Sequence, residues 1–299
     1  MSNFRKAWLD QEYARQKNES IPGFAQGVPL KDGIELLPHQ ARVIRQLYIN
    51  ATTLPRHPHG IRGNVLAAVM GAGKTITSLV YALSHIPRGP DKLPGLVICS
   101  RPLLDMWKNQ GIDKFLDPRS TKVLYYHNDF ISRSLVNHLT RAQLLEYDLV
   151  LTTYETVLYA DKTTNAHNDI RVMGQIGVAG QSSKRLHYIA KRTLDQANDA
   201  SVTGRGILFK TPWPLVIADE PQCFANYTTH RFQAMMSVYG EEYLCLTGTP
   251  TRNYDTDIWS LFRWMNYSSI LRPKSKTGPT WNVNLLETHN LSPYLLQVT

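Results

Sequence analysis

The chain has 299 residues, 42% hydrophobic and 19% charged, so it is long enough for a sizeable core and has the composition of an ordinary globular protein. Its formal net charge of +9 favours an acidic partner, of which nucleic acid is the commonest. No apolar run approaches the ~20 residues that cross a bilayer, and the charged N-terminus has no signal-peptide core. These features exclude a membrane protein and predict an intracellular one, in the nucleus or cytoplasm or, if the source is viral, in the host cell.

The predicted elements alternate between short apolar runs and helices. After a polar extension over 1–30, the run 39–50 predicts a helix, 64–70 a buried strand and 76–86 a second helix. Strands are predicted at 96–100, 122–126, 148–154, 214–220 and 243–249, with a helix over 103–116 after the first of these. This alternation predicts an α/β fold with a parallel sheet, helices on both faces and right-handed crossovers.

One domain is predicted over residues 31–270. The segment 160–212 interrupts the alternation and contains five glycines, so we expect an insertion at the edge or top of the sheet. The stretch 271–299 is turn-rich and basic at its start, and is expected to leave the domain as a C-terminal tail.

The segment GAGKT (71–75) is the candidate P-loop, and it joins the predicted strand 64–70 to the helix that follows. A turn at a helix N-terminus attracts anions because backbone N–H groups and the helix dipole both point at it. Gly71 and Gly73 would let the backbone approach phosphate oxygens. Lys74 would reach the β and γ phosphates, and the Thr75 hydroxyl would ligate Mg²⁺. The predicted phosphate-binding residues are Met70, Gly71, Ala72, Gly73, Lys74 and Thr75.

An acidic pair, Asp219 and Glu220, ends the predicted strand 214–220. Ligands of parallel sheets bind at the carboxyl ends of the strands, so we expect this pair beside the P-loop. Asp219 would hold Mg²⁺, and Glu220 would orient and deprotonate the attacking water, which makes Glu220 and Lys74 the predicted catalytic residues. The next strand ends in Thr247, Gly248 and Thr249. The small hydroxyl residues there could sense the phosphate and couple its loss to strand movement, although a plain turn fits equally well.

Six segments in order resemble the motifs of superfamily-two helicases, in the Swi/Snf-like translocase branch, over roughly residues 35–270. They are LLPHQ (36–40), AVMGAGKT (68–75), LVICSRPLLDMWKNQ (96–110), YDLVLTTYET (147–156), ADEPQCFAN (218–226) and LCLTGTPTRN (244–253). The resemblance implies a single RecA-like P-loop NTPase lobe that binds ATP and Mg²⁺, with Gln40 reading the adenine. It also implies a nucleic acid partner, DNA rather than RNA, whose backbone would be contacted by Ser100, Arg101, Thr152, Thr153 and Asn253.

Two features depart from the family pattern. The usual Asp-Glu-Ala-His ends here in Pro221 and Gln222, so the coupling role of the histidine would fall to Gln222, which can donate and accept hydrogen bonds. The family also has a second lobe that supplies an arginine to the ATP site. The residues after 270 are too few for that lobe, so we expect a partner lobe in trans or in a longer chain, and poor hydrolysis by this chain alone.

Two other classes remain possible from the sequence. A non-enzymatic nucleic-acid-binding or regulatory module could retain the ATPase fold, which Gln222 and the missing lobe would suit. A P-loop kinase acting on a small acceptor is disfavoured, because Ala68 replaces the first P-loop glycine and no arginine-rich lid is evident.

Overall fold

The computed structural model describes residues 28–52, 62–86, 92–164, 204–248, 255–265 and 295–298. Its strands are β1 (Gly63–Ala68), β2 (Gly95–Cys99), β3 (Val123–Tyr125), β4 (Leu149–Thr153), β5 (Trp213–Asp219), β6 (Gly240–Thr247) and β7 (Leu295–Val298). They form one sheet in the order β3-β4-β2-β5-β6-β1-β7, and every pair of neighbouring strands is parallel. The predicted parallel α/β fold is confirmed.

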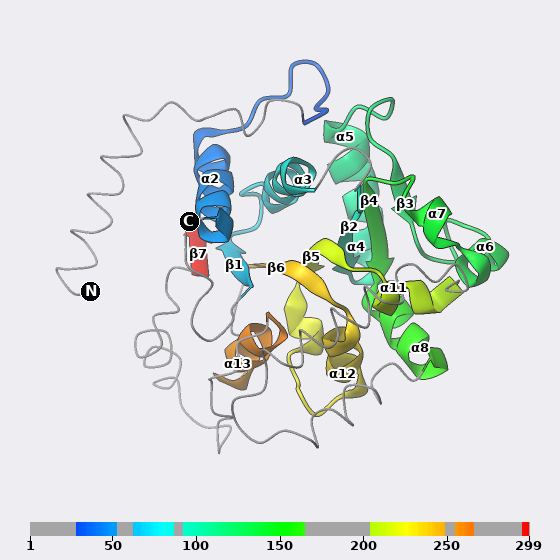
Figure 1. The fold of residues 1–299 in the computed structure, drawn as a ribbon. Coiled ribbons are helices and arrows are strands. Elements are labelled where there is room, and N and C mark those ends of the chain that lie inside the picture. Colours follow the sequence, from blue (N-terminus) through cyan, green and yellow to red (C-terminus); the bar gives the residue numbers. More distant parts are fainter. Residues whose placement is uncertain are drawn as a thin grey trace.

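Helices cover both faces of the sheet (Figure 1). They are α2 (Pro38–Thr52), α3 (Lys74–His85), α4 (Arg101–Met106), the π-helix η1 (Trp107–Ile112), α5 (Asp113–Phe115), α6 (Arg133–His138), α7 (Arg141–Leu144), α8 (Tyr154–Thr164), the 3₁₀-helix η2 (Gly204–Gly206), α11 (Ile207–Lys210), the 3₁₀-helix η3 (Pro221–Phe224), α12 (His230–Ser237) and α13 (Asp255–Trp264). In this part of the chain no helix combines the length and apolar character that a bilayer crossing requires.

Two hydrophobic cores lie on opposite faces of the sheet. Successive side chains of a strand point to opposite faces, so Val97 of β2 packs with α2 and α3, while Ile98 packs with α8, α12 and α13. The central strands are therefore apolar on both sides, and β1, β2, β4 and β5 are buried along their whole length. This explains why they appear in the sequence as continuous apolar runs.

The predicted ends of the domain are partly wrong. Residues 295–298, expected in a tail that leaves the domain, return to the sheet as β7 beside β1. At the other end, Val28 is buried in the core and Leu30 forms a bridge with Leu116, although both were assigned to the N-terminal extension. These apolar residues complete the side of the sheet that carries α2 and α3. Residues 1–27 and 271–294 lie outside the described part of the chain.

The predicted insertion, 160–212, is too wide at both ends. Residues 160–164 complete α8, and 204–210 form η2 and α11, where Ile207 and Leu208 are buried in the core. Gly204 was one of the five glycines that suggested an insertion. It has a φ of +67° and lies against the backbone of Asn137, where a Cβ atom would be 2.1 Å from the carbonyl oxygen. Residues 165–203 lie outside the described residues.

Candidate nucleotide-binding site

The turn between β1 and α3 has the conformation of a phosphate-binding loop. Gly71 has a φ of +85° and Gly73 a φ of +81°, values that favour glycine because it lacks a Cβ atom. Helix α3 begins directly afterwards at Lys74, so its first N–H groups and the positive end of its dipole face the turn. Met70 at the tip of the turn is exposed.

Helix α2 holds this loop from the side. The buried Gln40 accepts a hydrogen bond from the backbone N–H of Leu37 (2.9 Å), and its side-chain amide lies against Gly73. A Cβ atom on Gly73 would be 2.1 Å from Gln40 Nε2, so the approach requires glycine. His39 Nε2 lies 3.1 Å from the carbonyl oxygen of Ala72. The predicted adenine-reading residue therefore sits next to the loop, and its contact with adenine stays a prediction.

Lys74 lies folded over the same turn. Its ammonium group donates to the carbonyl oxygen of Ala68 at 2.8 Å and lies 3.5 Å from that of Val69. Both acceptors are weak partners for a cation, which prefers an anionic oxygen. The side chain is thus placed to exchange these carbonyl contacts for phosphate oxygens.

Sheet register brings the other predicted residues to the same place. Ala67 of β1 is paired with Thr247 of β6, and Leu246 of β6 is paired with Asp219 of β5. Strands β5, β6 and β1 are adjacent and parallel, so their carboxyl ends meet at one edge of the sheet. Burial raises the pKa of Asp219, and the charge of the nearby Lys74 ammonium opposes part of that rise. The P-loop lysine, the acidic pair and the end of β6 therefore share one site.

Asp219 is 8% exposed, and its carboxylate accepts a 2.7 Å hydrogen bond from the indole N–H of Trp107. Burial is the largest influence on this carboxyl and raises its pKa to about 6. The Trp107 hydrogen bond opposes the increase, the neighbouring charge of Glu220 adds to it, and Lys74 opposes it. The fold thus places a buried, hydrogen-bonded carboxyl group with a raised pKa at the end of β5.

Trp107 begins a π-helical turn, η1, in the middle of the predicted helix 103–116. Trp107 is 1% exposed and packs in the core. The same π-turn approaches the P-loop helix, because a Cβ atom on Gly111 would lie 2.8 Å from Thr75 Cγ2. One element therefore contacts both residues predicted to ligate Mg²⁺, Thr75 and Asp219. Single π-helical turns inside α-helices are frequent at functional sites.

Glu220 follows β5 with a φ of +52°, the one positive φ among the described non-glycine residues. Such a conformation costs about 1–3 kcal/mol and persists only where its surroundings fix it. Here the Glu220 N–H donates to Leu246 at 2.8 Å, and the Gln222 amide donates to the Glu220 carboxylate. The Thr247 hydroxyl lies 3.4 Å from both Glu220 Oε2 and Gln222 Oε1. The structure therefore joins the predicted catalytic carboxylate to two predicted coupling residues.

The remaining predicted coupling residues are placed only in part. Gly248 follows β6 at the P-loop, where a Cβ atom would be 3.8 Å from the carbonyl oxygen of Ala68. Thr249 and the predicted nucleic-acid contact Asn253 lie outside the described residues.

The predicted nucleic-acid contacts at the end of β4 need correction. Thr152 and Thr153 are fully buried because β4 lies inside the sheet with both faces covered. Their hydroxyl groups are used internally: that of Thr152 donates to the carbonyl oxygen of Tyr126 at 2.9 Å, and that of Thr153 pairs with Thr156 at 3.0 Å. A backbone phosphate cannot reach them in this structure. Thr156, on the first turn of α8, is more accessible.

Ser100 and Arg101 lie at the end of β2, as predicted, on the sheet edge that carries the P-loop. Ser100 is the N-cap residue of α4. The Arg101 guanidinium already pairs with Asp129 at 2.7 Å and Asp105 at 2.6 Å, and it lies over the ring of Phe130. A nucleic acid contact by Arg101 would have to compete with these two carboxylates.

Comparison with known proteins agrees with this geometry. Residues 8–276 match the SNF2-related domain. The chain belongs to the SNF2-related family. Protein 172L of Invertebrate iridescent virus 6, named as a candidate helicase, is 34% identical over 274 residues, which cover 88% of this chain and 43% of that protein. The ATP-dependent DNA helicase DDM1 of Arabidopsis thaliana is 25% identical over 241 residues, 79% of this chain and 24% of the relative.

A solved structure, the SWI2/SNF2 ATPase core of Sulfolobus solfataricus in complex with dsDNA, has the same fold as this SNF2-related domain. The TM-score is 0.58 at 22% identity, over 91% of this chain and 46% of the other. The chain thus spans less than half the length of these relatives. It is an SNF2-related domain built on a parallel α/β sheet.

The donor atoms at this SNF2 site suit a magnesium ion. Mg²⁺ prefers hard oxygen ligands, usually one or two carboxylates together with phosphate oxygens and water. The Thr75 hydroxyl and the Asp219 carboxylate are such ligands, and η1 holds both from one side. The buried carboxylate with a raised pKa also gains from a cation that would neutralise it. The residues present therefore fit the ion.

Proposed function

We propose that this chain is the ATP- and Mg²⁺-binding lobe of a nucleic-acid-dependent translocase that acts on double-stranded DNA. The observation that carries the proposal is the convergence of Lys74, Asp219 and Thr247 at the ends of three adjacent strands. The dsDNA complex of the Sulfolobus relative and the DNA helicase activity in the name of DDM1 support duplex DNA as the partner.

Each residue has a role that its position supports. The P-loop N–H groups and Lys74 would bind the β and γ phosphates, and Gln40, fixed against Gly73, would contact the adenine. Glu220 would orient the attacking water and accept its proton. Its carboxylate is held by Gln222 and lies near the Thr247 hydroxyl, so a change at the γ phosphate could be transmitted to β6.

Thr75 and Asp219 would hold Mg²⁺, which when bound would neutralise phosphate charge as the bond to the γ phosphorus breaks. Trp107 keeps the Asp219 carboxylate in one orientation through its indole N–H. Such outer hydrogen bonds to ligating groups tune metal affinity.

Turnover would need an arginine from a second RecA-like lobe, in trans or in a longer chain. In analogous phosphoryl transfers an arginine finger contributes roughly 10³–10⁵ in rate. We therefore expect the chain alone to bind ATP and to hydrolyse it slowly.

Phosphate release tests this proposal. The wild-type chain should release phosphate slowly with or without duplex DNA, and Glu220→Gln should reduce the residual rate further. Fast DNA-stimulated turnover by the chain alone would show that a second lobe is not required. Calorimetric titration with ATP and Mg²⁺ separates the alternative function, because a non-enzymatic nucleic-acid-binding module predicts duplex binding without nucleotide binding.

A further inference from the structure

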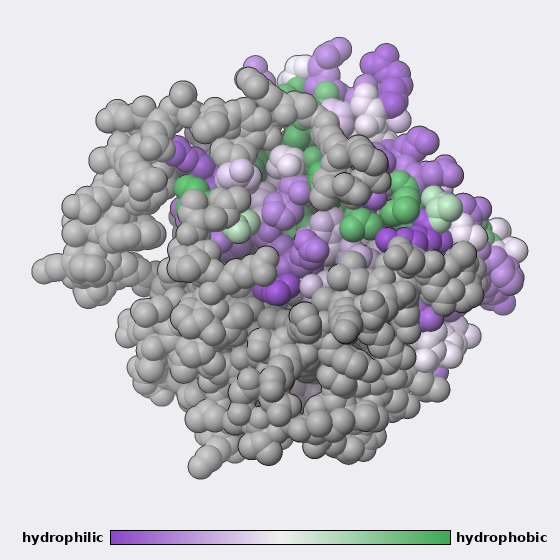
Figure 2. Space-filling model, viewed as in Figure 1, coloured by the Kyte–Doolittle hydropathy of each residue, from purple (hydrophilic) through white to green (hydrophobic). Residues whose placement is uncertain are grey.

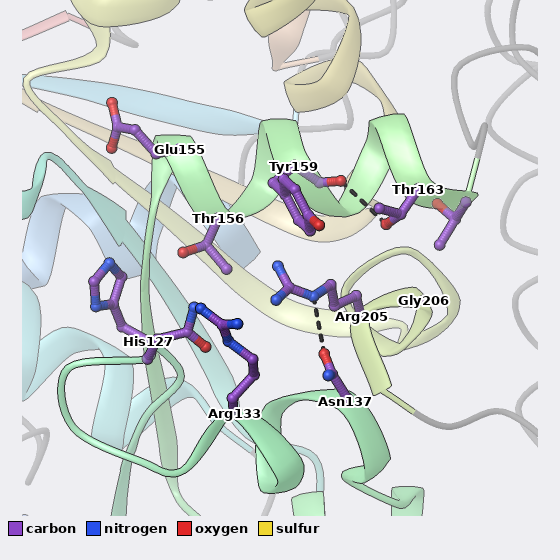
Figure 3. A pocket seen from close by; sticks show the side chains of 11 residues that line it. His127, Arg133, Asn137, Glu155, Thr156, Tyr159, Thr163, Arg205 and Gly206 are labelled. Atoms are coloured by element: carbon purple, nitrogen blue, oxygen red, sulfur yellow. Dashed lines mark hydrogen bonds between the residues drawn. The ribbon is translucent and has the colours of Figure 1, made fainter.

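A polar pocket of about 750 Å³ lies on the same sheet edge as the P-loop, but at its far end (Figure 3). His127 enters it from the end of β3, and Thr156 and Tyr159 enter it from α8, which begins where β4 ends. Five strand spacings of roughly 4.8 Å separate β3 from β1, or about 24 Å. The pocket is therefore separate from the triphosphate site.

Arg205 is held rigidly at one wall. Gly204, just before it, donates its N–H to the carbonyl oxygen of Leu139 at 2.9 Å and packs on the backbone of Asn137. Arg205 Nε then donates to Asn137 Oδ1 at 3.2 Å, and the guanidinium carbon lies 4.2 Å from the centre of the Tyr159 ring. Its terminal amino groups have no hydrogen-bond partner among the residues that the structure describes. They form a pre-oriented fork, the geometry that suits phosphate oxygens.

A second arginine approaches from another element. Arg133 begins α6, is exposed, and makes no ion pair with any residue in the described ranges. Figure 3 shows the guanidinium groups of Arg133 and Arg205 pointing into the same space from two sides. Two guanidinium groups that have no carboxylate partner among the described residues and are aimed at one pocket favour an anionic ligand.

The lining contains little to oppose that charge. Its acidic member among the described residues, Glu155, is paired with Arg231 at 3.1 Å. Asn128, Asn137 and Thr156 add neutral polar groups that can hydrogen-bond to oxygen atoms. The described surface around α6 and α8, at the right in Figure 2, is largely hydrophilic. The site is thus a polar, positively charged recess.

The geometry points to a phosphate-binding pocket in which Arg133 and Arg205 hold a phosphodiester group of the nucleic acid backbone. The inference rests on the proposed function and adds a contact to it, on the sheet edge where Thr152 and Thr153 proved to be buried. A backbone phosphate is favoured over free phosphate because the same edge carries Ser100 and Arg101 at the end of β2, beside β4. A nucleic acid strand lying along this edge would contact both the pocket and the end of β2.

The salt dependence of duplex binding tests this assignment. For B-DNA, the slope of log affinity against log salt is about −0.9 for each phosphate contact. We expect Arg133→Ala and Arg205→Ala each to make the slope less negative by about 0.9, and to weaken binding on the order of tenfold at low salt, the loss of one charge-assisted hydrogen bond. ATP affinity should not change.

Arg119→Ala is the matched control. Arg119 is 87% exposed and precedes β3, so it lies at the opposite edge of the sheet, and its removal changes the net charge equally. For Arg119→Ala, the slope of log affinity against log salt should equal that of the wild type. Because Arg133 has no partner among the described residues, its variant should fold even if Arg205→Ala is destabilised, and thermal melting of each variant checks this.

Three outcomes would overturn the inference. If Arg133→Ala and Arg205→Ala bind duplex as Arg119→Ala does, the pocket is not a backbone contact, while the proposed function stands. If the wild-type chain binds ATP but no duplex DNA, both the inference and the part of the proposed function that names DNA as the partner are wrong. If inorganic phosphate, titrated at constant ionic strength, binds wild type but not the double variant while DNA affinity is equal, the ligand is a free anion.

Discussion

The buried Asp219 carboxylate should lower the free energy of unfolding of the metal-free protein, relative to a variant with an uncharged side chain at this position. Asp219→Asn keeps an oxygen that can accept the Trp107 hydrogen bond and removes the charge. The pKa of Asp219 is about 6 in the folded chain, against an ordinary value of 3.8 for an aspartate carboxyl. Each unit of pKa difference corresponds to about 1.4 kcal/mol, so ionised Asp219 costs about 3 kcal/mol of folding free energy above pH 6.

The sign of the pH dependence follows from proton binding. Between pH 3.8 and about 6 the folded state holds the proton that the unfolded state has lost, so wild-type stability falls as pH increases through this window. Asp219→Asn has no carboxyl group at this position, so its stability does not fall in this way. Its advantage should be near zero below pH 3.8 and reach about 3 kcal/mol above pH 6, with roughly 1.4 kcal/mol of it developing between pH 5 and pH 7.

Urea denaturation in EDTA at several pH values measures the effect. EDTA is needed because a bound cation would stabilise the native wild-type protein and hide the difference. Asp32→Asn is the control, since Asp32 is an exposed carboxylate. If Asp219→Asn is less stable than wild type at pH 8, ionised Asp219 is a stabilising group, and the hydrogen bond from Trp107 and the charge of Lys74 outweigh burial.

Two further substitutions test the loop and the π-turn. Alanine at either Gly71 or Gly73 is strained by positive φ, but only Gly73→Ala must also displace Gln40, so it should lose at least about 1 kcal/mol more in urea denaturation; equal losses would contradict the packing. Trp107→Phe keeps most of the apolar volume but loses the N–H, so the affinity for ATP with Mg²⁺ should fall about tenfold. Its affinity in EDTA should equal that of wild type, and an equal loss in EDTA would make Trp107 a packing residue alone.

The sequence predicted the elements well because each central strand is a continuous apolar run that ends in polar residues. The rule that parallel strands place ligands at their carboxyl ends then put Lys74 and Asp219 at one edge, and the register confirms it. Strand order was not predictable in this way. That β6 lies between β1 and β5, which brings Thr247 to the Glu220 carboxylate, depends on long-range packing.

The errors have a common physical cause: residue type does not reveal burial. Thr152 and Thr153 have suitable hydroxyl donors, yet they end an internal strand and satisfy each hydroxyl locally. Trp107 is a core residue whose buried indole N–H needs an acceptor, and only the fold shows that this acceptor is Asp219. The strand 295–298 was missed because turn-rich sequence precedes it.

Titration with ATP in Mg²⁺ and in EDTA tests most directly whether one site holds the triphosphate and its metal. Lys74→Ala should weaken ATP binding at least tenfold in both buffers, because its ammonium would bind phosphate without the metal. Asp219→Asn should weaken it at least tenfold in Mg²⁺ and leave it unchanged in EDTA. Wild-type affinity of Asp219→Asn in Mg²⁺, or of Lys74→Ala in either buffer, would contradict the shared site.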